Sequence, residues 1–161
     1  MPRPEKRLSK EPLGLHQVEA IIAAPDIADP LGIRDRAMLE LFCSLGLRRD
    51  ELAKLALHDF NRELQTLQIL QSKDGKDRVV SVGERALTWL ERYLDEVRPL
   101  LLQTNEPVLF LTSKGEAVNP DVISRMVTKY FKKAEIDRPG SCHLLRHTWA
   151  MHMLEGGADI Q

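Results

Sequence analysis

Apolar residues recur three and four positions apart over most of this chain, and this spacing predicts a largely helical protein. Six helices are predicted, over about residues 15–24, 30–45, 49–55, 83–101, 121–134 and 143–154. The apolar face of the second helix carries Ile33, Ala37, Leu41 and Leu45. Because such a stripe must be buried, the helices are expected to pack around a shared core.

Residues typical of helix ends support these boundaries. Asp29 is suited to cap the second helix because its side chain can accept a backbone hydrogen bond, and Pro30 suits the first helical position. Gly46 is expected to end that helix, since glycine readily adopts the left-handed conformation that follows many helices. Ser141 is a suitable cap for the last helix, and this predicts where that helix begins.

Two short segments, 66–70 and 78–82, have the alternating pattern of β-strands. The segment between them contains Asp74-Gly75, a dipeptide typical of tight hairpin turns. A third short strand is expected near 59–64, and 108–111 is expected to be a short buried strand or an extended segment. The predicted fold class is therefore α+β, mostly helical with one small antiparallel sheet.

Length and composition indicate one globular domain. The chain has 161 residues, of which 43% are hydrophobic and 29% charged, as in ordinary soluble domains. Residues 1–12 are rich in Pro, Lys, Arg and Glu and are predicted to be a linker or flexible arm, which leaves 13–161 as the domain. Apolar runs long enough to span a membrane and a secretory signal are both absent, so a cytoplasmic protein without membrane contact is expected. Neither of the two cysteines belongs to a CxxC pair, so no metal site is predicted.

The charge distribution leaves nucleic-acid binding open. A net charge of −1 and a pI near 6.5 are unlike those of most DNA-binding domains, which carry a basic surplus. Basic residues nevertheless gather on the helix predicted over 121–134, at Arg125, Lys129, Lys132 and Lys133. These residues either form a basic face that binds DNA or an ordinary solvated surface.

Four residues at helix ends and turns have the chemistry needed to bind a reacting phosphate. His143 and Arg146 are three residues apart on the last predicted helix, so they share one face. Arg48 closely follows the glycine that ends the second helix, and a guanidinium can bind two phosphate oxygens at once. Lys73, in the predicted hairpin turn, can protonate a leaving alkoxide. Each motif alone is weak evidence for such a site, and the prediction rests on their combination and order.

Together these motifs resemble the catalytic domain of tyrosine recombinases, the phage integrase and Xer-type family. The resemblance covers the chain from about residue 13 to its end. It rests on LGLRRDEL at 45–52, SKDGKDRVV at 72–80, HLLRHTWA at 143–150 and GGAD at 156–159. It implies a site-specific recombinase that cleaves and rejoins double-stranded DNA through a 3′-phosphotyrosyl intermediate, without a metal or other cofactor. It also implies a complex with other recombinase protomers.

The resemblance implies a catalytic role for each of the four residues. Arg48 and Arg146 would hold the scissile phosphate, and His143 would act as an acid or base near the nucleophile. Lys73 would donate a proton to the leaving 5′ oxygen. Lys76, in the same segment, is a competing candidate for that lysine and is otherwise expected to contact DNA.

Two further residues match the family pattern in supporting positions. Glu51 corresponds to an acidic residue that follows the first arginine, and it is expected to support Arg48. His147 also matches, but a packed histidine that is bonded to the backbone is the better interpretation.

The nucleophile is the one part of the family pattern without a match. In the family a tyrosine follows the Gly-Ala-Asp segment, whereas Tyr93 and Tyr130 both precede Arg146 and lie on or near apolar stripes. Both are therefore predicted to be core residues. The chain is expected to be a catalytic domain truncated before its nucleophile and inactive alone. A DNA-binding remnant or regulator without chemistry is an alternative, and a purely structural helical protein is a third possibility.

Overall fold

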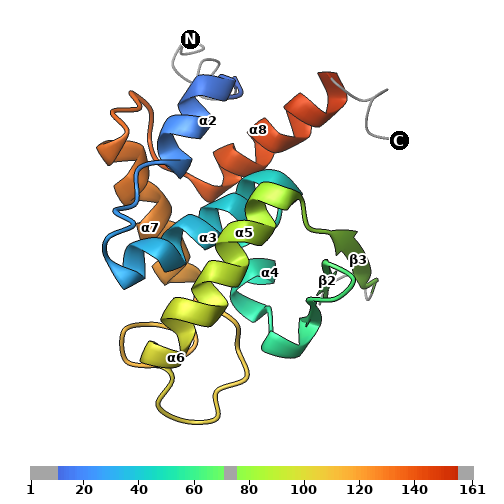
Figure 1. Ribbon diagram of the computed structural model, residues 1–161. Helices are drawn as coiled ribbons and strands as arrows, with labels where there is room; N and C mark the ends of the chain where they lie inside the picture. The colour runs from blue at the N-terminus through green and yellow to red at the C-terminus, as the bar shows by residue number, and fades with distance from the viewer. Residues whose placement is uncertain (1–10, 71–75, 156–161) are drawn as a thin grey trace.

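The computed structural model describes residues 11–70 and 76–155, and it places the other helices around the long helix α3 (Figure 1). In chain order the helices are α2 (Leu15–Ile22), α3 (Pro30–Leu45), α4 (Arg49–Lys54), α5 (Glu84–Arg92), α6 (Arg98–Leu101), α7 (Pro120–Lys133) and α8 (Cys142–Glu155). A 3₁₀ turn, η1 (Leu57–Asp59), follows α4, and a π-helical turn, η2 (Tyr93–Val97), joins α5 to α6. The six helices predicted from the sequence are therefore confirmed.

Helix α3 begins and ends at the residues that the sequence indicates. The Asp29 side chain accepts a hydrogen bond of 2.9 Å from the Leu31 N–H, and Pro30 occupies the first turn. Gly46 follows the helix with φ of 63°, in the left-handed region. Helix α3 packs against α2, α5, η2 and α8. Because it is covered on several sides, its buried surface extends beyond the predicted apolar residues to Leu39 and Glu40.

A small antiparallel sheet lies at one side of the helices (Figure 1). Its strands are β1 (Phe60–Asn61), β2 (Thr66–Ile69) and β3 (Arg78–Ser81), in the order β1-β2-β3. The two longer predicted strands and the third short one are thus confirmed, whereas the turn with Asp74-Gly75 lies outside the described residues. Segment 108–111 is not a continuous strand, because it forms isolated bridges at Val108 and Leu111 and bends at the two residues between them.

The helix predicted over 83–101 is present but irregular. It changes to a π-helical turn at η2, where the Arg98 N–H donates to the Tyr93 carbonyl. Pro99 explains this change, because proline has no N–H and its ring clashes with the carbonyl four residues earlier in a regular helix. The Tyr93 hydroxyl is buried beside this turn, where it donates to the Leu109 carbonyl at 2.9 Å and accepts from the Leu111 N–H at 3.0 Å.

A buried ion pair connects α3 to α7. The Arg34 guanidinium donates to Asp35 Oδ1 at 2.8 and 3.0 Å and to the Leu111 carbonyl at 3.0 Å. The Tyr130 hydroxyl of α7 donates to Asp35 Oδ2 at 2.6 Å. Since both charges have several hydrogen-bond partners, this network can be buried without a charge left unpaired.

The chain ahead of α2 packs onto α8, which positions the last helix. Leu13 is buried, its N–H donates to Thr148 Oγ1 at 3.0 Å, and its carbonyl lies 2.9 Å from His152 Nε2. Leu15, predicted on the apolar face of the first helix, is instead 68% exposed, because the core is filled by Leu13 at this end. Among the residues that the structure describes, no helix is both long and apolar enough to cross a membrane.

Candidate functional site

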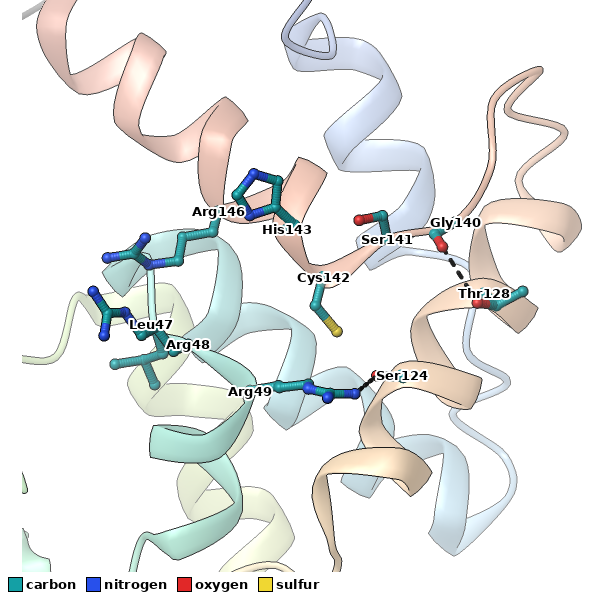
Figure 2. A pocket seen from close by; sticks show the side chains of 10 residues that line it. All are labelled: Leu47, Arg48, Arg49, Ser124, Thr128, Gly140, Ser141, Cys142, His143 and Arg146. Atoms are coloured by element: carbon teal, nitrogen blue, oxygen red, sulfur yellow. Dashed lines mark hydrogen bonds between the residues drawn. The ribbon is translucent and has the colours of Figure 1, made fainter. Parts of the chain in front are cut away.

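A pocket of about 580 Å³ lies between the turn that follows α3, helix α7 and the start of α8 (Figure 2). Its lining residues are Leu47, Arg48, Arg49, Ser124, Thr128, Gly140, Ser141, Cys142, His143 and Arg146. Three of the four predicted catalytic residues, Arg48, His143 and Arg146, therefore meet in one pocket although they lie far apart in the sequence. Lys73 lies outside the described residues.

The turn between α3 and α4 positions Arg48. Gly46 ends α3 in the left-handed conformation, and Arg48, two residues later, is the N-cap residue of α4 with extended backbone. The Arg48 N–H donates to Glu51 Oε1 at 2.9 Å, which fixes the backbone of this turn. The Arg48 side chain is exposed and points toward that of Arg146 (Figure 2).

Glu51 supports Arg48 through the backbone, and the sequence did not reveal its second partner. Arg78, at the start of β3, donates to Glu51 Oε2 at 3.1 Å and to Oε1 at 3.4 Å. Burial favours a raised pKa for Glu51, but the hydrogen bonds from Arg78 and from the Arg48 N–H outweigh it, so the pKa is lowered. Glu51 therefore links the first arginine of the pocket to the sheet as a buried carboxylate.

Helix α8 contributes the other two predicted residues. Ser141 Oγ accepts from the Leu144 N–H at 3.1 Å, which confirms Ser141 as the cap of this helix. His143, in the first turn, is exposed, and Arg146 follows one turn later and is half-buried. Arg146 Nε donates to the Gly46 carbonyl at 3.2 Å, so the guanidinium is held directly beside the turn that carries Arg48.

The pocket has the electrostatic character of an anion site. Three arginines line it, and none of its lining residues in the described ranges carries a carboxylate. Arginine suits phosphate because its planar fork matches two phosphate oxygens. Cys142 also lines the pocket, and burial raises the pKa of its thiol, so the thiol is neutral and adds no negative charge. The arrangement can bind a phosphate group and stabilise charge that develops on it.

Sequence analysis missed Arg49, which also lines the pocket. Its side chain crosses to α7, where it donates to Ser124 Oγ at 2.6 Å (Figure 2). The adjacent Arg-Arg pair after Gly46 was the available signal, but the sequence could not show that Ser124 lies opposite.

The basic residues of α7 lie next to this pocket. Ser124 and Thr128 on the same helix line it, and the basic side chains are all exposed: Arg125, Lys129, Lys132 and Lys133. Within the described ranges, none of these four forms an ion pair with a carboxylate. The surface is therefore available to a polyanion, and its DNA-binding role stays a prediction.

The remaining predicted residues lie away from the pocket lining. Lys76 is exposed just before β3, and His147 is half-buried on α8. The roles predicted for both residues stay untested.

Both tyrosines are core residues, as predicted. Burial raises the pKa of Tyr93 to about 12, and burial together with the hydrogen bond to Asp35 raises the pKa of Tyr130. Each hydroxyl is engaged in the buried contacts described above. Neither tyrosine lines the pocket.

Comparison with known proteins agrees with the motifs and the geometry. The model of the phage integrase family matches residues 12–161. Tyrosine recombinase XerC 2 of Ralstonia nicotianae is 48% identical over 161 residues, which are 100% of this chain and 46% of the relative. Tyrosine recombinase XerD of the same species is 40% identical over 161 residues, 99% of this chain and 51% of the relative. The chain thus spans about half the length of these curated relatives.

Solved structures share the fold. The XerA recombinase structure aligns with a TM-score of 0.81 and 28% identity, covering 91% of this chain and 52% of that one. The lambda integrase catalytic core aligns with a TM-score of 0.68 and 18% identity, covering 92% and 85%. At that identity the second likeness concerns the fold alone. With the family match over nearly its whole length, the chain belongs to the phage integrase family of tyrosine recombinases.

Proposed function

We propose that this chain supplies the phosphate-binding part of a site-specific DNA recombinase active site. The observation that carries the proposal is the meeting of Arg48, His143 and Arg146 in a pocket that no carboxylate lines among the described residues. In the whole protein this site serves cleavage and rejoining of duplex DNA by transesterification, through a 3′-phosphotyrosine.

The chemistry assigns each residue a task. Arg48 and Arg146 bind the non-bridging oxygens of the scissile phosphate and stabilise the extra negative charge of the transition state. A tyrosine oxygen forms a bond to phosphorus while the bond to the 5′ oxygen breaks, and Lys73 gives that oxygen its proton. His143, at the rim of the same pocket, exchanges the proton of the attacking hydroxyl. No metal or other cofactor takes part in this scheme.

Duplex DNA is the proposed substrate. The exposed basic residues of α7, and Lys76 near the sheet, extend positive charge away from the pocket and would contact neighbouring phosphates. XerH, which has this fold with a TM-score of 0.77 and 22% identity, has been crystallised with its palindromic difH substrate after cleavage. A lambda integrase tetramer of the same fold has been crystallised with a Holliday junction. These structures support DNA and further recombinase protomers as the partners of this chain.

The 161-residue polypeptide by itself is proposed to bind DNA without cutting it. Tyr93 and Tyr130 are its two tyrosines, both are buried, and neither lines the pocket. Loss of a nucleophile commonly costs several orders of magnitude in rate. A nicked suicide substrate should therefore yield no covalent adduct. An adduct mapped to either tyrosine would refute this part of the proposal.

Arg48→Gln tests the pocket itself. Its side chain is exposed and makes no hydrogen bond to another described residue, so the substitution should leave the fold intact. The affinity falls as salt rises, and each lost phosphate contact makes the slope of log K against log salt less steep by about 0.9. Anisotropy titrations of a short duplex at several salt concentrations should show this loss. Failure of the unaltered polypeptide to bind DNA even at low salt, or an unchanged slope for Arg48→Gln, would contradict the proposed function.

A further inference from the structure

Arg49 carries a charge that its surroundings in the protein only partly balance. Its side chain is 45% exposed, and in the described part of the chain it pairs with one carboxylate, that of Asp121, at 3.8 Å. Arg62 and Arg85 are exposed to nearly the same degree, at 48% and 47%, yet they hold carboxylates at 2.9 and 2.7 Å. Arg49 therefore differs from comparable surface arginines in how weakly it is paired.

The position of Arg49 is also unlike that of a solvated surface residue. The guanidinium lies inside the pocket, against Ser124 and below Cys142 (Figure 2). Burial raises the pKa of the Cys142 thiol, and the Ser124 hydroxyl and the Arg49 charge both oppose that rise. The hydrogen-bond partner of Arg49, Ser124 Oγ, is a neutral group at 2.6 Å. A guanidinium has five N–H donors, and this contact uses one of them.

Arg48 and Arg49 point in opposite directions from one turn. The Arg48 side chain extends toward Arg146, whereas the Arg49 side chain extends toward α7 (Figure 2). The pocket thus has two cationic ends, one formed by Arg48 and Arg146 and one formed by Arg49. The second end adjoins the exposed basic side chains of α7.

We propose that Arg49 binds a second DNA phosphate, next to the scissile phosphate on the same strand. This inference rests on the proposed function, since it takes the end with Arg48 and Arg146 as the site of the scissile phosphate. Consecutive phosphates of one strand are the anions that would reach both ends of one continuous pocket. The contact orients the strand along the cleft toward α7. The neutral hydroxyl of Ser124 holds the guanidinium in place without competing for its charge.

The experiment compares charge-matched variants of the 161-residue polypeptide in duplex titrations over a series of salt concentrations. Arg49→Gln removes the proposed contact, and Arg62→Gln removes an equally exposed arginine that pairs with Asp95. Arg49→Lys keeps the charge, and Ser124→Ala removes the hydroxyl but leaves the arginine. Circular dichroism confirms that each variant folds, and Arg48→Gln is measured in parallel as the test of the pocket itself.

The proposal predicts that Arg49→Gln makes the slope of log K against log salt less steep by about 0.9. Binding near 0.1 M salt should weaken about eightfold. Arg49→Lys and Ser124→Ala should each retain most of the slope because both keep the charge, and Arg62→Gln should retain all of it. An unchanged slope for Arg49→Gln while Arg48→Gln lowers it would overturn this inference and leave the proposed function intact. Equal reductions in this slope from Ser124→Ala and Arg49→Gln would also overturn the inference. They would show that Arg49 acts only through its structural contact between α4 and α7. No effect from either arginine would count against the proposed function as well.

Discussion

Substitution of Gly46 by alanine tests whether the turn between α3 and α4 depends on close packing. This turn carries Arg48 and accepts a hydrogen bond from Arg146. Gly46 has φ of +63°, and a Cβ atom there would lie 2.2 Å from Cε3 and 2.3 Å from Cδ2 of Trp149. These contacts are far shorter than van der Waals distance. The Trp149 ring is held in turn by a hydrogen bond of 3.0 Å from its Nε1 to the Ser44 carbonyl. The ring therefore has little freedom to move away.

Two costs add in the Gly46→Ala variant. A left-handed backbone costs a residue with a Cβ about 1–2 kcal/mol. Overpacking of a well-packed site costs about 1–3 kcal/mol. The expected loss is about 2–5 kcal/mol, a large part of the 5–15 kcal/mol typical of a domain. Because the Gly46 carbonyl accepts from Arg146 Nε, DNA binding should weaken as well.

Denaturant unfolding followed by circular dichroism measures this loss, and a double-mutant cycle separates its parts. Trp149→Ala removes the clashing ring. The double variant should therefore lose about 1–3 kcal/mol less unfolding free energy than the two single variants lose in sum. Gly83→Ala is the matched control, because a Cβ there meets nothing within 4 Å. A loss below about 1 kcal/mol for Gly46→Ala, or strict additivity with Trp149→Ala, would refute the packing argument.

Three further predictions concern groups around the core. Glu51→Gln should make stability depend less on pH in acid. The pKa of Glu51 is lowered in the folded protein, so its carboxylate stabilises the fold at pH above the ordinary pKa of 4.5, and this stabilisation is lost as pH falls through the folded-state pKa. Urea unfolding at a series of pH values measures this dependence. Asp35→Ala leaves Arg34 buried without its carboxylate and should cost about 3–5 kcal/mol, measured by the same unfolding assay. Burial, with Glu40 nearby, raises the pKa of Cys43 to about 12, so alkylation near pH 8 should be slow until urea unfolds the chain; rapid alkylation of the folded chain would contradict this.

The parts of the fold that could be predicted are those set by neighbouring residues. Asp29 and Gly46 define the two ends of α3 because capping depends on the backbone within one turn. Ser141 defines the start of α8 for the same reason. The π-helical turn before Pro99 was missed, since apolar periodicity reports which face is buried and not how the backbone hydrogen bonds are made.

The candidate site could be predicted in part, and the missing parts depend on contacts across the chain. Arg48, His143 and Arg146 were found because their motifs are local and resemble a known family. The contact between Arg49 and Ser124 joins residues 75 positions apart, and that between Arg78 and Glu51 joins residues 27 positions apart. The first pairing follows from the packing of α7 against α4, and the second from the approach of the start of β3 to α4, neither of which a single sequence reveals.

The most direct test of the central claim is an NMR titration of the 161-residue polypeptide with a short DNA duplex. The guanidinium Nε–H signals of Arg48 and Arg146 and the ring signals of His143 report on the pocket itself. The account predicts that these signals shift together, saturate with one Kd, and lose their response as salt is raised. Shifts confined to the lysines of α7, with all three pocket residues unchanged at saturation, would show that DNA does not enter the pocket and would contradict the account.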